Sequence, residues 1–367
     1  MLFIRPKLNQ KINDDFKFNL YLWFKTESMK LKIALVCGGY SGEAEVSMRS
    51  AAFVESTLDR SKYEVYKIEV TQQYWSYQHL EESYLIDRND FTLSIEDRKI
   101  SFDLVFMMIH GSPGENGQLQ GYFEMLDIPY TCCDSLTSAL TMNKAYTKAV
   151  IDGIEDMYLA RSIQLMEDNQ ESAEALIADK LRLPLFVKPN AGGSSIGMSK
   201  VTEAAGVRQA VDLAFETVNA GRQVLVEEFV TGREFSIGVY RFGKEVDVLP
   251  ATEVITQRDF FDYEAKYTPG LTEEITPASL NEEQRLRAER IVKEIYKRLN
   301  CRGLVRIDFF LEEATDRFYF IEVNTIPGQT QTSFIPQQIR ASGRTETDFY
   351  AAWIDSSYDY FRPNTEK

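Results

Sequence analysis

Short apolar runs alternate with amphipathic stretches along the sequence, and this alternation constrains the fold more than any other feature. Residues 32–37, 63–70 and 104–109 are apolar runs of strand length, whereas residues 44–58 have the spacing of a helix. Glycines follow the first run, and His110 follows the third. Because the strands of an open parallel sheet bring their carboxyl ends to one edge, this order predicts an α/β fold with a binding site in the loops after the strands.

Two further regions follow the first, again with strands and helices. The strands expected there cover residues 183–187, 223–230, 303–312 and 318–324, and the helices cover residues 135–152, 173–181, 204–218 and 281–300. Because Met29 leads directly into the first strand, we expect residues 1–28 to be an N-terminal extension or a mis-assigned start. We therefore divide the chain into this extension, an N-terminal α/β domain over residues 29–134, a central domain over residues 135–232 and a C-terminal domain over residues 233–367.

The composition argues against several kinds of site. The 367 residues include 41 Lys and Arg against 56 Asp and Glu, a net charge of −15, which argues against a protein that coats nucleic acid. With only two histidines, any metal should be a hard cation on oxygen ligands. Four cysteines without C-x-x-C spacing indicate a reducing, cytoplasmic compartment. No apolar run reaches the roughly 18 residues of a membrane span, so neither nucleic acid nor a membrane is an expected partner.

Two strands near the C-terminus carry polar side chains in strict alternation with apolar ones. Period two places Arg306 and Asp308 on one face of the first strand. It places Glu322 and Asn324 on one face of the second, and a turn within residues 313–317 sets Asp308 opposite Glu322. Two carboxylates and an amide oxygen are suitable ligands for Mg²⁺. The alternative is a solvated strand face with a cross-strand ion pair.

A loop rich in glycine and serine, residues 189–197, follows the strand that ends at Lys188. Such a loop lets backbone N–H groups approach an anion closely, and the lysine adds a positive charge. The loop is neither a Walker A motif nor a dinucleotide-binding fingerprint, because the chain contains neither Gly-x4-Gly-Lys-Ser/Thr nor Gly-x-Gly. The alternative is a flexible hairpin loop without a ligand.

Several single residues have two interpretations each. His110 stands at a strand end among glycines, where it can act on a ligand, although a lone histidine is more often structural. Glu43 either binds a ligand or favours the start of a helix. Glu227, Glu228 and Glu234 contact a base and its sugar, or they are surface charge.

Residues 262–270 have the character of a lid, being polar and aromatic and ending in Pro-Gly. Together with the lysines and the carboxylates, this segment favours a Mg²⁺-nucleotide site without a P-loop. Phosphoryl transfer is the reaction class that such a site supports.

Over residues 30–350 the chain resembles the D-alanine–D-alanine ligases of the ATP-grasp superfamily. The matching segments are, in chain order, GGYSGEAEVS, HGSPGENG, MNKAYTK, VKPNAGGSSIGMSKV, VEEFVTGREFS, FDYEAKY, VRIDFF and IEVNTIPGQTQTSFIP. Each segment alone is moderately specific, but their order and spacing together are highly specific. The resemblance implies a three-domain ATP-grasp architecture with an N-terminal open parallel α/β domain. It also implies ATP-dependent ligation of two D-alanine molecules to D-alanyl-D-alanine, through an acyl phosphate, for peptidoglycan precursor synthesis.

The resemblance implies roles for individual residues as well. Those that would bind ATP are Lys144, Lys188, Ser195, Glu227, Glu228, Val230, Glu234 and Lys266. Those that would bind D-alanine or take part in catalysis are Glu43, His110, Ser194, Tyr267, Arg306, Gly328 and Ser333. Two Mg²⁺ or Mn²⁺ ions would lie on Asp308, Glu322 and Asn324. The resemblance also implies a homodimer.

In the implied mechanism, Glu43 binds the ammonium of the first D-alanine, and His110 lies near its carboxylate. Arg306 and the Gly328 N–H stabilise the oxyanion that forms when the second amine attacks, and Ser333 holds the second carboxylate.

The lid has its own implied contacts. Ser194 and Tyr267 link it to Glu43 through hydrogen bonds, and Lys266 reaches the γ-phosphate when the lid closes and excludes water. Tyr267 favours D-alanine over D-lactate as the second substrate. The Pro-Gly after Tyr267 and the stretch over residues 329–332 depart from the familiar family forms, which leaves the lid conformation and the second subsite open.

Three alternatives remain at this point. The nearest is a depsipeptide ligase that takes D-lactate, and the others are a nucleotide-binding module without turnover and an acidic scaffold protein.

Overall fold

The computed structural model describes residues 30–193, 196–217, 222–256 and 272–362 of the chain. Three β-sheets and the helices that cover them make up this part, so the α/β class is confirmed. The N-terminal extension over residues 1–28 lies outside the described residues. Among the described helices, none combines the length and the apolar character needed to cross a membrane.

The N-terminal sheet contains the first strands of the chain. Its strands are β1 (Leu31–Gly38), β2 (Tyr63–Val70), β3 (Trp75–His79), β4 (Glu82–Asp87), β5 (Thr92–Ile95), β6 (Arg98–Ile100) and β7 (Leu104–Met107). Their order is β6-β5-β4-β3-β2-β1-β7. The strands predicted to be parallel are so, because β1 pairs in parallel with both β2 and β7. The outer strands β3 to β6 form an antiparallel extension that the sequence pattern did not predict.

Burial explains why the sequence pattern predicted the parallel strands but not the outer ones. β1 is fully buried from Ile33 to Cys37, since it lies between two strands and is covered on both faces. The outer strands are short and only partly buried, and Leu85 of β4 is exposed, so their apolar pattern is weak. Two helices follow the strand ends that build the site, namely α2 (Ala44–Thr57) and α3 (Gln118–Met125).

The central sheet is antiparallel, with the order β11-β10-β12-β9. Its strands are β9 (Ser162–Met166), β10 (Leu185–Pro189), β11 (Ser199–Val201) and β12 (Gln223–Glu228). The helices beside it are α6 (Ala173–Lys180) and α7 (Val207–Glu216), with short 3₁₀ turns at η1 (Glu167–Ser172) and η2 (Ala204–Gly206). One apolar core between the helices and the sheet includes Ile177, Val187 and Val211.

The C-terminal sheet carries the predicted hairpin at its centre. Its strands are β8 (Met157–Tyr158), β13 (Arg233–Arg241), β14 (Asp247–Val248), β15 (Thr252–Thr256), β16 (Thr272–Ile275), β17 (Gly303–Glu312) and β18 (Arg317–Asn324). The order is β16-β15-β13-β17-β18-β8, with β14 paired to β13. The helices of this part are α9 (Glu282–Arg298), α10 (Phe334–Ala341) and α11 (Glu346–Phe361).

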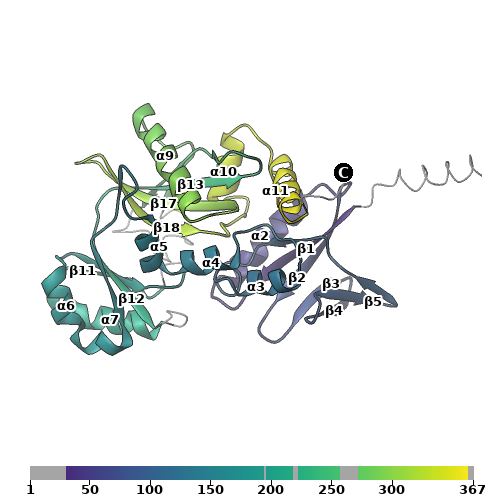
Figure 1. The fold of residues 1–367 in the computed structure, drawn as a ribbon, viewed down its shortest axis with the longest axis horizontal. Coiled ribbons are helices and arrows are strands. Elements are labelled where there is room, and N and C mark those ends of the chain that lie inside the picture. Colours follow the sequence, from purple (N-terminus) through teal and green to yellow (C-terminus); the bar gives the residue numbers. More distant parts are fainter. Residues whose placement is uncertain (1–29, 194–195, 218–221, 257–271, 363–367) are drawn as a thin grey trace, which may run out of the picture.

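The three sheets lie side by side, with the central one at the lower left of Figure 1, the C-terminal one above it and the N-terminal one at the right. The last helix, α11, joins the C-terminal part to the N-terminal part. Trp353 on α11 packs against Phe106 of β7 with ring centroids 5.0 Å apart, and its Nε1 donates to the Thr131 carbonyl at 2.7 Å. This contact fixes the N-terminal strand ends relative to the hairpin.

The stretch predicted to be helical over residues 135–152 is helical, but it consists of two helices. They are α4 (Ser135–Met142) and α5 (Lys144–Ile151). Asn143 between them has an extended backbone, and its side chain accepts a hydrogen bond from the Tyr146 N–H. Its amide also contacts Asn190 and Gln223 of the central part. Helix periodicity alone does not reveal such a break, because these tertiary contacts stabilise it.

Candidate active site

Two adjoining cavities lie between the three parts of the molecule. The first, of about 320 Å³, reaches from Glu43 and His110 to Ser333. The second, of about 120 Å³, reaches to Lys188 and Glu227. Both are lined by Lys144, Gly192, Gly193, Arg306, Glu322 and Phe334. A chemical group at this shared wall is therefore accessible to ligands in both cavities.

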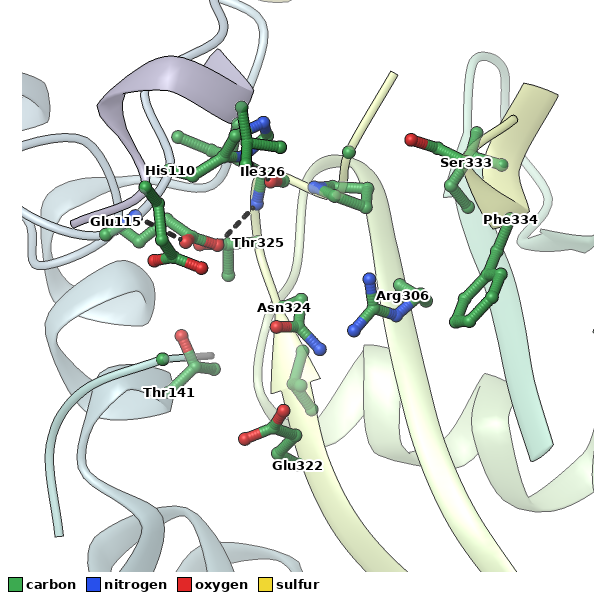
Figure 2. Close-up of a pocket in the computed structure, with 18 of the residues that line it drawn as sticks. His110, Glu115, Thr141, Arg306, Glu322, Asn324, Thr325, Ile326, Ser333 and Phe334 are labelled. Atoms are coloured by element: carbon green, nitrogen blue, oxygen red, sulfur yellow. Dashed lines mark hydrogen bonds between the residues drawn. The ribbon is translucent and has the colours of Figure 1, made fainter. Parts of the chain in front are cut away.

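The hairpin of β17 and β18 has the register predicted from its alternating sequence. Asp308 lies opposite Glu322, and Arg306 lies opposite Asn324. The side chains of Arg306 and Asp308 are only 20% and 7% exposed, so the alternative of a solvated strand face is wrong. Figure 2 shows Arg306 near Asn324 on one side and near Ser333 and Phe334 on the other.

Asp308 is the most heavily hydrogen-bonded carboxylate of this face. It accepts bonds from Arg306 Nε at 2.9 Å and Nη2 at 2.7 Å. Ser236 Oγ donates to it at 2.6 Å and Asn324 Nδ2 at 3.0 Å. Burial acts to lower the pKa of Arg306, but the charges of Asp308 and Glu322 outweigh it and raise that pKa. Arg306 is therefore a fixed cation, held in the two-pronged geometry that guanidinium and carboxylate groups favour.

Glu322 faces a second cation, Lys144, at the start of α5. Lys144 Nζ lies 3.3 Å from Glu322 Oε2 and donates to the Gly192 carbonyl at 2.8 Å. The lysine thus connects the hairpin with the glycine-rich loop of the central part. Its place in the first turn of a helix is one that favours anions.

The donor set at the hairpin fits a hard cation. Asp308, Glu322 and the Asn324 amide supply oxygen ligands, which Mg²⁺ and Mn²⁺ prefer. Within the described residues no group of three His, Cys, Asp or Glu side chains forms a metal site. Asp308, Glu322 and Asn324 supply fewer oxygen ligands than octahedral Mg²⁺ takes, so waters or phosphate oxygens would complete the coordination.

Glu227 lies between two lysines in the second cavity, with its side chain only 12% exposed. Lys188 and Lys148 both form ion pairs with it, one at each carboxylate oxygen. Lys148 also donates to the Ala160 carbonyl and to Ser162 Oγ, each at 2.8 Å. Burial alone would raise the pKa of Glu227, but the two lysines outweigh it and lower that pKa to about 2. Glu227 is consequently charged at every ordinary pH, so the alternative of surface charge is wrong for this residue.

The remaining residues of the predicted nucleotide site also line the second cavity. Glu228, Val230 and Glu234 lie along it, with Glu234 at the start of β13. Glu228 differs from its neighbour, because it pairs with the exposed Arg182 at 3.4 Å and accepts the Arg182 backbone N–H at 3.0 Å.

Glu43 precedes α2 and lines the first cavity, where two glycines surround it. Its side chain makes no capping hydrogen bond to the helix, although Glu43 occupies the N-cap position, where the helix dipole favours a carboxylate. A Cβ built on Gly193 would lie 2.8 Å from Glu43 Oε2, and one on Gly111 would lie 3.0 Å from the same atom. These two glycines leave room for the carboxylate where it lies, and the contact with Gly193 brings the loop of the central part against the N-terminal part.

His110 lies at the end of β7 with both ring nitrogens engaged. Nδ1 lies 2.8 Å from the Ile326 carbonyl, and Nε2 lies 3.0 Å from Ser50 Oγ. Because a carbonyl only accepts, Nδ1 carries the proton and the Nε2 of a neutral ring accepts from Ser50. Burial lowers the pKa of His110, although the Glu43 carboxylate opposes this, and the neutral ring agrees with the hydrogen bonds.

Gly328 and Ser333 lie at the other end of the first cavity, before α10. A Cβ on Gly328 would lie 3.1 Å from Ser333 Oγ. Ser333 Oγ accepts the Thr330 N–H at 3.0 Å and lies 2.8 Å from Thr330 Oγ1. Gly328 and Ser333 both line the first cavity, while their roles as an oxyanion and carboxylate subsite stay a prediction.

Comparison with known proteins gives the family. The model of the D-ala D-ala ligase N-terminus matches residues 32–133, and that of the D-ala D-ala ligase C-terminus matches residues 154–355. A D-alanine–D-alanine ligase of Azobacteroides pseudotrichonymphae is 40% identical over 325 residues, 88% of this chain and 99% of the relative. The chain belongs to the D-alanine–D-alanine ligase family.

Solved structures agree with this membership in the family. The VanG D-Ala:D-Ser ligase from Enterococcus faecalis has a TM-score of 0.80 and is 32% identical, covering 90% of this chain and all of that one. The D-alanyl-alanine synthetase A from Vibrio cholerae has a TM-score of 0.78 and is 29% identical, covering 90% and 98%. The three-sheet architecture is therefore that of the ligase family.

Four of the predicted ligase residues lie outside the described part of the chain. They are Ser194, Ser195, Lys266 and Tyr267. The predicted lid over residues 262–270 lies outside it as well. The other predicted site residues all line one of the two cavities.

Sequence reasoning missed two residues of this ligase site. Lys148 lies four residues after Lys144 in the matching segment MNKAYTK, and that helical spacing was the available signal. Glu115 lies in HGSPGENG, where a carboxylate among glycines after a buried strand was the signal. Glu115 accepts the Gly111 N–H at 2.8 Å and the Ile326 N–H at 2.9 Å. Figure 2 shows its carboxylate beside Ile326, below His110.

Proposed function

We propose that this protein joins two D-alanine molecules into D-alanyl-D-alanine at the expense of ATP, as a step of peptidoglycan precursor synthesis. The observation that carries the proposal is the wall that the two cavities share. Arg306 lies on it, between a cavity with Glu43 and His110 and a cavity with lysines. A nucleotide in the second cavity would thus meet an amino acid in the first.

ATP would occupy the second cavity. Its phosphates would lie near Lys144 and Lys188, since both lysines line this cavity and contact Glu322, Gly192 and Glu227 there. The adenine would meet Glu227, Glu228 and Val230, and the ribose would meet Glu234, as family resemblance implies.

The hairpin would hold the metal. Asp308, Glu322 and Asn324 would bind two Mg²⁺ or Mn²⁺ ions together with phosphate oxygens, as their oxygen donors permit. When bound, such ions neutralise the charge that develops on the transferred phosphoryl group. Arg306 now pairs with Asp308 and Lys144 with Glu322, so bound metal ions would compete with these two cations for the carboxylates.

The first D-alanine would place its ammonium at Glu43 and its carboxylate near His110. A carboxylate oxygen attacks the γ-phosphorus, the bond to the bridging oxygen breaks, and ADP leaves with that electron pair. The product is a D-alanyl phosphate. Glu43 is suited to this role because its carboxylate faces the cavity between two glycines.

The second D-alanine would bind near Ser333, which would hold its carboxylate. Its neutral amine attacks the acyl carbon and loses a proton, and the tetrahedral intermediate expels phosphate. Arg306 and the Gly328 N–H would stabilise the oxyanion of that intermediate, usually the largest effect in acyl transfer. Their places on the wall of the first cavity support this assignment.

Family resemblance alone supports the lid. Ser194 and Tyr267 would connect it to Glu43, while Ser195 and Lys266 would contact the phosphates. The same resemblance supports a cytoplasmic homodimer. The domain boundaries at residues 134/135 and 232/233 agree with the central sheet, which lies wholly between them, although β8 crosses over to the C-terminal sheet.

A second candidate differs only in the second substrate. The similarity to VanG, a D-Ala:D-Ser ligase, favours a test of D-serine in the second subsite. Discrimination between a methyl and a hydroxymethyl group depends on the packing of that subsite.

The test is phosphate release from ATP and Mg²⁺ with a panel of amino acids. We expect release that requires D-alanine alone, with D-alanyl-D-alanine as the product. Arg306→Ala should lower kcat by about 10³-fold, whereas Arg317→Ala on the exposed end of β18 should leave it within about threefold. Release that requires D-serine or D-lactate as well would assign the second substrate differently, and no release with any pair would contradict a ligase.

A further inference from the structure

The Ile326 peptide in the loop that follows β18 is held from both sides by the N-terminal part of the molecule. His110 Nδ1–H donates to the Ile326 carbonyl at 2.8 Å, and the Glu115 carboxylate accepts the Ile326 N–H at 2.9 Å. The residues that meet here are 216 and 211 positions apart in the chain. His110 is buried and Glu115 is partly buried, so little solvent competes for these bonds.

The same loop has a third attachment, through Ser50 of α2. Ser50 Oγ contacts His110 Nε2 at 3.0 Å and accepts the Gln329 N–H at 3.2 Å. Tyr350 of α11 then donates its hydroxyl to Gln329 Oε1 at 2.8 Å. Bonds therefore hold the loop at Ile326 and at Gln329, on either side of Gly328.

We infer that Glu115 is a positioning residue, whose carboxylate sets the backbone of residues 326–328 so that the Gly328 N–H points at the reacting carbonyl. This inference rests on the proposed ligase function. Glu115 is well placed for the task because its other oxygen accepts the Gly111 N–H at 2.8 Å. One carboxylate thereby couples the loop that carries His110 to the loop that carries Gly328.

A carboxylate is needed here because both partners are N–H donors. A glutamine in place of Glu115 would offer one acceptor oxygen and turn its NH₂ group toward the second N–H. One hydrogen bond would be lost, and two donors would face each other where little water can reach them. An error of about 1 Å in the loop can lower catalysis by about 100-fold.

The experiment compares Glu115→Gln with Glu124→Gln as a matched control. Glu124 is also a carboxylate that accepts a backbone N–H, from Ser135 at 3.0 Å, and it accepts hydroxyls from Tyr130 and Ser135. It lines neither cavity. We expect Glu115→Gln to lower kcat by about 10- to 100-fold with the KM for ATP within about threefold. Glu124→Gln should leave kcat within about threefold, and Glu115→Asp, which keeps both acceptors, should recover part of the loss.

A second readout does not need activity. Amide hydrogen exchange at Ile326 and Gly111 should become at least about tenfold faster in Glu115→Gln and stay unchanged in Glu124→Gln. A kcat within threefold of the parent enzyme, or unchanged exchange at Ile326, would overturn the inference. If the parent enzyme releases no phosphate with D-alanine, the proposed function fails, while the exchange data still decide whether Glu115 holds the loop.

Discussion

Glu227 and Glu115 are both largely shielded carboxylates, one in each cavity, yet their pKa values move in opposite directions. Glu227 lies between Lys188 and Lys148, whose charges outweigh burial and lower its pKa to about 2. For Glu115, burial is reinforced by the nearby charge of Glu43 and raises the pKa to about 7, although two backbone N–H groups oppose the shift. Burial is common to both, so the charges of the neighbours decide the direction.

The opposite pKa shifts show that the two cavities differ in the charges that surround their buried carboxylates. In the second, the Glu227 carboxylate forms ion pairs with both Lys188 and Lys148 and stays charged at neutral pH. In the first, burial and the charge of Glu43 raise the pKa of Glu115 to about 7. Strongly shifted carboxylates of this kind cluster at functional sites.

Of the substitutions considered, the one that neutralises Glu227 should change the free energy of unfolding most. Glu227→Gln leaves Lys148 and Lys188 buried without a counter-charge, which should lower the free energy of unfolding by about 3–5 kcal/mol at pH 7. Because the folded pKa is lowered, this stabilisation is present above pH 4.5 and is lost as the pH falls toward 2. Denaturant unfolding at pH 7 and at pH 4 measures it. If Glu227→Gln lowers the free energy of unfolding by less than about 1 kcal/mol at pH 7, the two lysines do not stabilise the Glu227 carboxylate as described.

Glu115 should have a smaller effect on the free energy of unfolding than Glu227, with the opposite pH dependence. The folded pKa of Glu115 is raised from 4.5 to about 7, so its contribution to stability is full below pH 4.5 and is lost as the pH rises through 7. Relative to the parent protein, Glu115→Gln should therefore gain about 3 kcal/mol of unfolding free energy between pH 4.5 and pH 8.

The measurement is the free energy of unfolding of the parent protein and of Glu115→Gln as a function of pH. Contributions of groups that titrate alike in both proteins cancel in the difference. The charged or titratable groups that face Glu115 are Glu43 before α2, His110 after β7 and Arg306 on β17. A difference that does not change with pH would show that Glu115 has an ordinary pKa.

Substitution of Glu228, the residue after Glu227, should change the free energy of unfolding least. Glu228 pairs with Arg182, whose side chain is 82% exposed, so Glu228→Gln should change the free energy of unfolding by about 1 kcal/mol or less. The same denaturant measurement at pH 7 tests this. A loss as large as that of Glu227→Gln would mean that position along β12, rather than the partner lysines, sets the energy.

Much of the fold was predictable because the signals were local. The buried run of β1 and the period-two alternation of β17 and β18 depend on neighbouring residues alone, and the structure has the predicted strands and the predicted register. The break at Asn143 was not predictable in this way, because contacts with Asn190 and Gln223 of another part of the chain stabilise it.

The site also has some features that local sequence predicts and others that depend on tertiary contacts. The alternation of polar and apolar residues predicts which polar side chains share a strand face, and therefore the oxygen ligands Asp308 and Glu322. The charge state of each shielded carboxylate depends instead on tertiary contacts, because the neighbours that shift the pKa, Lys188 and Lys148 for Glu227 and Glu43 for Glu115, are distant in the chain. A pKa depends on distances in space and on the exclusion of water, and packing sets both.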